Sequence, residues 1–213
     1  MSHEFKLPKE SFVNKFIAKN KFYEKANLSS ILQKEFVDKI QKITWKYKLA
    51  ESTIGIAKTE TVTEIQIFEI ELKEPVIPKN VLKIIDKSIP YQILYRFVYE
   101  NAVAFGITLK ENTSVENYYF CDWNEDITFD FTGIDLEKIY QKLVKAFIRD
   151  EAQSKSSFSE IIDVDNKIKT LEAEIASLEK RINKEKQFNR KVELNARLRT
   201  VKSEVDALVG DGT

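Results

Sequence analysis

The chain has 213 residues, and its 34 basic and 34 acidic side chains cancel, so the overall charge predicts no partner. Apolar residues make up 43% of it, which is typical of a globular core and excludes a disordered chain. The single cysteine, Cys121, excludes an intrachain disulfide, and no apolar run approaches the ~18 residues of a membrane span. We therefore expect a soluble cytoplasmic protein with no membrane partner.

The zero net charge hides a segregation of charge along the chain. Residues 1–48 hold eleven Lys and five acids, and residues 111–137 hold eight acids with no Lys or Arg. Residues 158–179 hold six acids and two Lys, whereas residues 180–202 hold nine basic residues and two Glu. Such runs are solvated faces or, alternatively, charge-complementary contacts.

The first 48 residues predict an arm followed by a helix. Residues 1–27 are rich in Lys with scattered aromatics, and we expect an ordered arm pinned to a core. Ser29 or Ser30 can cap a helix over 30–48, whose apolar residues recur at steps of three and four.

The middle of the chain alternates strand and helix signals. Residues 63–73 (TEIQIFEIELK) alternate and are rich in Ile, which makes them the clearest strand. The other predicted elements are a strand at 53–57, a helix at 80–88, a hairpin of strands 91–99 and 102–110, strands at 114–122 and 127–131, and a helix from Asp135 to Arg149.

This order predicts an α+β fold with a mainly antiparallel or mixed sheet and helices packed on one face of it. A C-terminal coiled-coil helix or helical hairpin follows the sheet. We expect the globular domain to span 1–152, a Ser-rich linker 153–160, and the helical tail 161–209.

The tail carries the seam of a coiled coil. Its apolar residues recur at alternating steps of four and three, and the phase breaks across residues 183–191. An antiparallel arrangement would place the acidic first half against the basic second half. A hairpin within one chain and an antiparallel homodimer both satisfy this pattern. The seam residues are Val164, Ile168, Leu171, Ile175, Leu178, Ile182, Leu194, Leu198, Val201, Val205 and Leu208.

The phase break predicts an exposed basic tip with one aromatic side chain. We expect this tip to contact a protein partner or nucleic acid, since an exposed Phe is unusual unless it meets a partner. The candidate contact residues are Lys184, Lys186, Phe188, Arg190 and Lys191.

One strand pattern resembles an active site. Glu69, Glu71 and Lys73 share a face of the 63–73 strand, and Glu-x-Lys at a strand end is similar to PD-(D/E)xK nucleases. In those enzymes acidic residues hold Mg²⁺ and the Lys orients the attacking water. The alternative is a structural row of charges paired with Arg96 or Lys110. The further acid that a nuclease needs would be Glu51, Glu60 or Glu64.

Other reactive side chains predict little chemistry. Four acidic residues cluster near Trp123 in sequence, namely Asp122, Glu125, Asp126 and Asp130. They are interpreted as a divalent-metal site or, alternatively, as a solvated acidic loop. His3 is the single histidine, so a zinc site or His-based catalysis is not expected, and Cys121 is interpreted as a half-buried or core thiol. No cofactor is expected apart from Mg²⁺ under the nuclease hypothesis. Tyr118, Tyr119 and Phe120 are interpreted as sheet packing or, alternatively, as a surface for bases.

Four segments together resemble one bacterial family, called domain of unknown function 4391, over about residues 7–208. They read LPKESFVNKFIAKNKFYEKANLS, EIQIFEIELKE, VLKIIDKSIPYQILY and LEKRINKEKQFNRKVELNARLR. The family has no assigned activity, so the resemblance carries over no functional residue. It implies a context of DNA restriction or phage defence, because members tend to be encoded beside helicases and DNA methyltransferases.

Three functional hypotheses follow. The first is a non-enzymatic accessory or adaptor subunit that acts with a helicase and a DNA methyltransferase and contacts them through its tail. The second is a metal-dependent nuclease, and the third is a protein that binds nucleic acid without sequence preference through its basic tip and Lys-rich arm.

Overall fold

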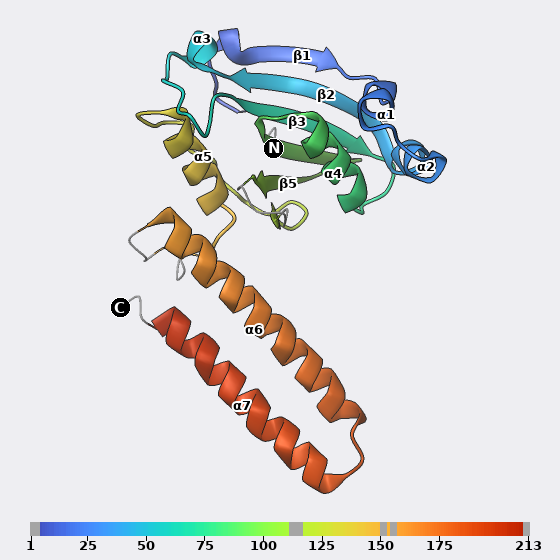
Figure 1. The fold of residues 1–213 in the computed structure, drawn as a ribbon, viewed down its shortest axis with the longest axis vertical. Helices are drawn as coiled ribbons and strands as arrows, with labels where there is room; N and C mark the ends of the chain where they lie inside the picture. The colour runs from blue at the N-terminus through green and yellow to red at the C-terminus, as the bar shows by residue number, and fades with distance from the viewer. Residues whose placement is uncertain (1–4, 111–116, 150–152, 154–156, 211–213) are drawn as a thin grey trace. The chain divides into compact units, whose positions relative to one another are not determined.

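The computed structural model describes residues 5–110, 117–149, 153 and 157–210 (Figure 1). The chain divides into two compact units, residues 1–147 (unit 1) and residues 148–213 (unit 2). Unit 1 is built on a mixed sheet and unit 2 holds a pair of long helices, which confirms an α+β fold with a helical hairpin. In the part of the chain that is described, no helix combines the length and the apolar composition needed to cross a lipid bilayer.

The sheet of unit 1 has six strands that lie side by side in their order along the chain. Only β3 and β4 pair in parallel, and the other four neighbouring pairs are antiparallel. A parallel pair needs a crossover connection, which α4 supplies here. The strands are β1 (Phe12–Phe16), β2 (Ile40–Leu49), β3 (Ile65–Leu72), β4 (Gln92–Tyr99), β5 (Ala102–Leu109) and β6 (Asn117–Phe120).

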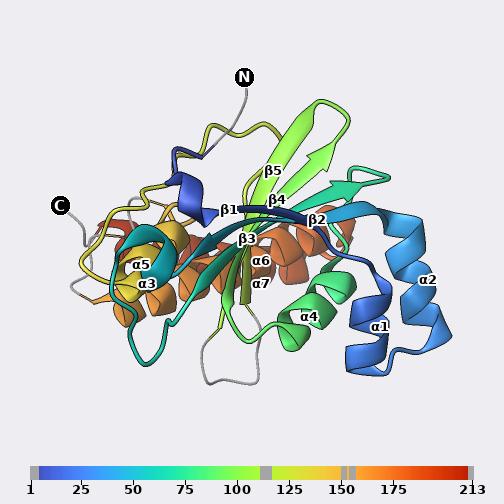
Figure 2. The same cartoon turned by 90° about the horizontal axis from the view of Figure 1, so that it is seen from above.

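Three helices cover one face of this sheet, α1 (Asn20–Ala26), α2 (Ser30–Lys39) and α4 (Lys79–Ser88) (Figure 2). The face is apolar because alternate residues of the central strands point to it, with Phe68 and Ile70 from β3 among them. Four inward residues of α4 complete the same core: Val81, Leu82, Ile84 and Ile85.

The opposite face is covered too, so the expectation of a single covered face is wrong. Ala104 belongs to the core under α4, and its neighbour Phe105 therefore points to the other side. There the Phe105 ring lies 5.0 Å from that of Phe129, which lies 5.6 Å from that of Phe147. The segment around Phe129 and the residues that follow α5 (Leu136–Lys145) thus cover part of the second face.

The helix expected over 30–48 ends at Lys39, and its second half is strand β2. The three-residue step from Ile40 to Ile43 looked helical, but it comes from a bulge that adds one residue to the strand. A second bulge lies between Trp45 and Tyr47. The β-branched and aromatic content of β2 and its pairing with β3 outweigh the apparent helical period.

Two further expectations near the N-terminus are corrected. No strand forms at 53–57: Thr53 and Ile54 belong to the short helix α3 (Glu51–Ile54), which is followed by Gly55 with a φ of 70°. Ala57 forms an isolated bridge with Asp135. The Lys-rich arm contains a 3-10 turn (Lys9–Ser11) and strand β1, which forms an edge of the sheet against β2. Because β1 exposes most of its side chains, it lacks the alternation that marks β3.

The remaining elements of unit 1 follow the sequence closely. The 91–99 and 102–110 strands form the expected hairpin as β4 and β5. Asp135 caps α5 by accepting a hydrogen bond from the Lys138 N–H at 2.7 Å, although α5 ends at Lys145 rather than Arg149. Residues 127–131 form no strand ladder, and residues 114–116 of another expected strand lie outside the described residues.

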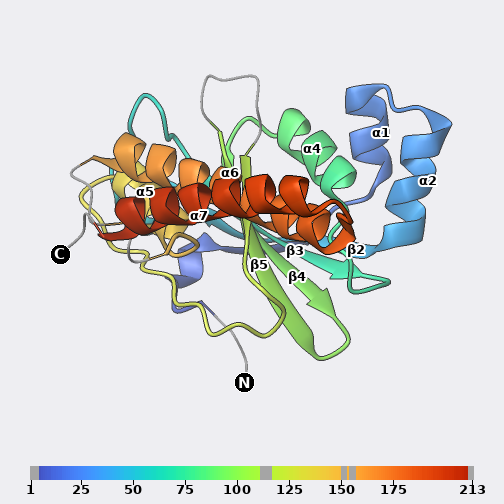
Figure 3. The ribbon, with the colours of Figure 1, turned by 90° about the horizontal axis from the view of Figure 1, so that it is seen from below.

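Unit 2 is an antiparallel hairpin of α6 (Phe158–Lys184) and α7 (Phe188–Gly210), side by side in Figures 1 and 3. α6 begins inside the stretch expected as linker, because Ser157 and Glu160 form a capping box. The seam packs within the chain, with Leu171, Leu178 and Val201 buried at its centre. Of the two arrangements left open by the sequence, the structure has the hairpin.

Charged side chains join the two helices along the hairpin as their segregation suggested. Glu174 of α6 accepts a hydrogen bond from Arg197 of α7 at 2.9 Å, and Glu179 pairs with Lys202 at 2.9 Å. The acidic half of the tail thus meets its basic half.

Candidate functional site

The expected catalytic residues lie in a row of ion pairs on β3. Glu69 is paired with Arg96 of β4, its neighbour in register, and lies 3.6 Å from the Nζ of Lys46. Glu71 lies 3.2 Å from the Nζ of Lys42 on β2. These pairs join β3 to both of its neighbours, which is the structural role that the sequence left open as the alternative.

Lys73 lies one residue beyond the end of β3 and is exposed. Burial lowers the pKa of nearby Lys19, and the positive charge of Lys73 lowers it further. Lys73 thus lies near another cation, and it takes part in none of the ion pairs that Glu69 and Glu71 form. Of the proposed upstream acids, Glu64 is ion-paired with Lys48 at 2.9 Å.

Within the residues described, no group of three or more His, Cys, Asp or Glu side chains could hold a metal ion. His3 lies outside them. The expected acidic cluster separates: Glu125 accepts a hydrogen bond from the Asp122 N–H at 2.7 Å, while Asp130 pairs with Lys142 at 2.6 Å. The Lys142 ammonium and Thr132 hold the pKa of Asp130 far below its usual value. The nuclease hypothesis stays a prediction that this geometry does not favour.

Cys121 is half-buried, and burial raises the pKa of its thiol. Its Sγ accepts a hydrogen bond from the Phe105 N–H at 3.1 Å. A raised thiol pKa leaves little reactive thiolate at neutral pH, so this side chain acts as packing for the sheet.

A buried polar network around Asp86 is the feature that the sequence analysis missed. The Asp86 carboxylate, on α4, accepts hydrogen bonds from Tyr95 at 3.0 Å, Thr108 at 2.9 Å and Tyr118. Lys110 lies 3.6 Å from the same carboxylate and donates to three backbone carbonyls at the end of α4 and beyond it. The network fixes α4 to the sheet. An Asp on the apolar face of a predicted helix was the signal that could have found it.

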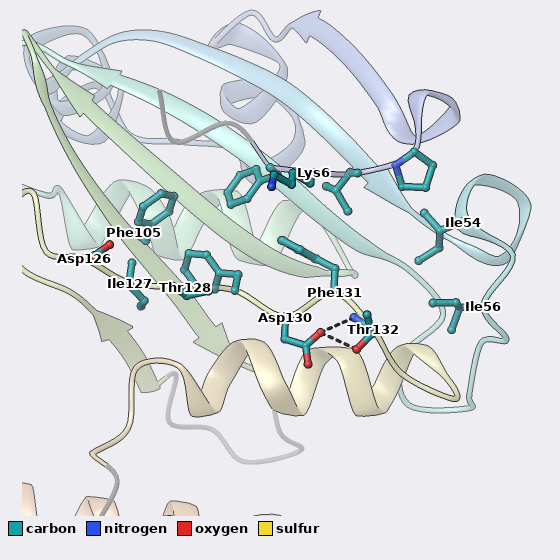
Figure 4. Close-up of a pocket in the computed structure, with 14 residues that line it drawn as sticks. Lys6, Ile54, Ile56, Phe105, Asp126, Ile127, Thr128, Asp130, Phe131 and Thr132 are labelled. Carbon is teal, nitrogen blue, oxygen red and sulfur yellow. Dashed lines mark hydrogen bonds between the residues drawn. The ribbon is translucent and has the colours of Figure 1, made fainter. Parts of the chain in front are cut away.

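An open apolar pocket of about 640 Å³ lies on the second face of the sheet (Figure 4). Residues 5–8 form one wall and residues 126–132 form another, with Phe105 of β5 between them and Ile54 and Ile56 at one end. The Phe5 ring contacts those of Phe129 and Phe131 at 6.0 and 5.4 Å, so these two residues share a face.

The expected contact residues gather where α6 turns into α7. Lys184 ends α6, and Phe188, whose side chain is 78% exposed, begins α7. Glu185 shapes the turn by accepting hydrogen bonds from the N–H groups of Lys186 and Gln187, both at 2.8 Å, and these bonds lower its pKa. All five basic and aromatic candidates are exposed, and we call them the hairpin tip: Lys184, Lys186, Phe188, Arg190 and Lys191.

Comparison with known proteins gives one match. The family model described as Domain of unknown function (DUF4391) matches residues 5–205, almost the whole chain. The search of curated proteins and the search of solved structures gave no match.

Proposed function

The chain belongs to the DUF4391 family, and we propose that it is a non-enzymatic adaptor subunit of a DNA-restriction or phage-defence assembly. It would act in the cytoplasm with a helicase and a DNA methyltransferase. The observation that carries the proposal is the hairpin tip, where an exposed Phe188 is flanked in sequence by four exposed basic residues. The helicase and the methyltransferase are proposed as partners on the family resemblance alone.

The packing of the coiled-coil seam within the hairpin supports a docking role for the tip. Leu171, Leu178 and Val201 of the seam are buried between α6 and α7, so the two helices already cover the centre of the seam for each other. Helices held by a packed seam and by ion pairs form a stiff support. An aromatic side chain on such a support binds at little entropic cost, and aromatic and Arg side chains dominate binding energy at protein interfaces.

The test is affinity purification of the full chain from its host, with copurifying proteins identified by mass spectrometry. The test variant replaces Lys184, Lys186, Arg190 and Lys191 by Glu and Phe188 by Ala. The control reverses four exposed lysines of unit 1, namely Lys9, Lys15, Lys21 and Lys34. We expect a helicase or methyltransferase to copurify with wild type and control and to be lost with the tip variant.

Two results would count against the adaptor function. Equal copurification with the tip variant would exclude the tip as the contact. If nuclease treatment removes every copurifying protein, the tip binds nucleic acid instead, and its affinity should then fall steeply with salt.

A further inference from the structure

The pocket of unit 1 and the hairpin tip of unit 2 have complementary chemistry. We propose that the tip of one copy of this chain binds in the pocket of a second copy, so that copies join head to tail. The inference rests on the proposed function in one respect, since it names a partner for the same tip.

The walls of the pocket are two extended segments that alternate in the same way. Phe5 and Leu7 on one wall, and Ile127, Phe129 and Phe131 on the other, are half-buried and line the pocket. The residues between them are exposed. Apolar side chains left half-exposed around a pocket of about 640 Å³ resemble a binding site, for which volumes of roughly 300–1,000 Å³ are usual.

Acidic residues outnumber basic ones in the lining of the pocket. Asp126 and Asp130 line it, with Asp130 paired to Lys142 at 2.6 Å, whereas Lys6 is the one Lys or Arg among the lining residues. Asp122 and Glu125 are exposed and lie close to Asp126 in sequence. The stretch 111–137, which includes one wall, has eight acids and no Lys or Arg. The pocket therefore favours an apolar group that is flanked by positive charges.

The hairpin tip has that chemistry. Phe188 and Val192 are 78% and 52% exposed, and their spacing of four places them together on α7. They are the large exposed apolar residues of unit 2 within its described part. Between Lys184 and Lys191 there are four basic residues and one acid, and that acid, Glu185, already binds backbone N–H groups.

A contact between tip and pocket is heterologous, because each copy uses a different surface for each of its two neighbours. Such contacts give closed rings or open chains of copies. A variant without a working tip still has an intact pocket, and a variant without a working pocket still has an intact tip. A mixture of the two should therefore form one tip-to-pocket contact, which joins one copy of each variant.

The experiment measures the mass of purified full-length chain by sedimentation velocity over a range of concentrations. Phe188→Ala removes the tip's aromatic anchor, and its control is Ile31→Ala, another exposed apolar side chain. Asp126→Lys with Thr128→Arg blocks the pocket, and its control is Asp38→Lys. All the substituted residues are exposed, and circular dichroism confirms that each variant is folded.

For wild type and both controls, we expect the fraction of chain in larger assemblies to rise with concentration. This fraction should be smaller at 500 mM than at 50 mM salt. Each test variant should weaken association by at least about tenfold, the effect of losing a central anchor. An equimolar mixture of the two test variants should form 1:1 dimers and nothing larger.

Several outcomes would overturn the inference. One is that wild type is monomeric at all concentrations. Another is that the pocket variant associates as strongly as wild type. A third is a mixture that forms no dimer. If the host proteins still copurify through the tip in any of these cases, the adaptor function stands without self-assembly. If copies associate but no host protein is captured, the adaptor function fails instead.

Discussion

The polar contacts of the two units differ in their burial. In unit 1 the Asp86 carboxylate is buried and joins Thr108 and Tyr118, which are 22 and 32 residues away in sequence. In unit 2 the ion pairs Glu174–Arg197 and Glu179–Lys202 between α6 and α7 are exposed. Unit 1 should therefore depend on single buried groups, whereas unit 2 should depend on its apolar seam.

The largest effect should come from Asp86→Ala. This change removes the buried carboxylate that Lys110 and three hydroxyls share, and it should cost about 3–5 kcal/mol of unfolding free energy. Urea denaturation followed by Trp fluorescence measures it, since Trp45 and Trp123 both belong to unit 1. Asp206→Ala on the exposed surface of α7 is the control and should change little. A loss below 1 kcal/mol would show that the network does not hold α4.

A smaller loss is expected from Leu178→Ala in the hairpin. Leu178 is 4% exposed and packs in the seam, so its truncation should cost about 2–3 kcal/mol of hairpin stability. Hydrogen exchange should then speed up in residues 158–210 and stay unchanged in β3 and β4. Faster exchange throughout both units would contradict the separate behaviour of the two regions.

The N-terminal cap of α6 should contribute less again. Ser157 accepts a hydrogen bond from the Glu160 N–H at 3.2 Å, and Ser157→Ala should cost about 1 kcal/mol. Amide exchange at residues 158–161 measures the fraying. Ser157→Asp keeps a cap and should restore protection, and failure to do so would remove the cap as the cause.

The smallest effect should be a pH dependence of the turn. The pKa of Glu185 is lowered by the N–H groups of Gln187 and Lys186, so its ionised form stabilises the turn above the usual Glu pKa of about 4.3. This contribution should disappear as pH falls from that value through the lowered pKa. Exchange of the Lys186 and Gln187 amides should rise over this window in wild type and be insensitive to pH in Glu185→Gln, after correction for intrinsic exchange.

The tail shows what a local pattern can predict. The steps of four and three marked the seam residues, and the charge segregation marked an antiparallel partner. Neither pattern distinguishes a turn from a dimer, because the same faces pair in both. The turn is formed by Glu185, whose carboxylate binds two backbone N–H groups, and the sequence pattern carries no sign of that contact.

The sequence by itself determined the elements whose residues repeat with one period: β3 through its alternating Ile residues, α4 through its apolar face, and the two long helices through their seam. Tertiary structure decided that residues 40–49 form strand β2, because its bulges give the apolar residues a spacing that resembles a helix. It also decided the Asp86 network. It also decided the pocket, since residues 5–8 meet residues 126–132 only across the folded sheet. A periodic pattern reports which face of an element is buried, but contacts between residues a hundred positions apart depend on how the whole chain packs.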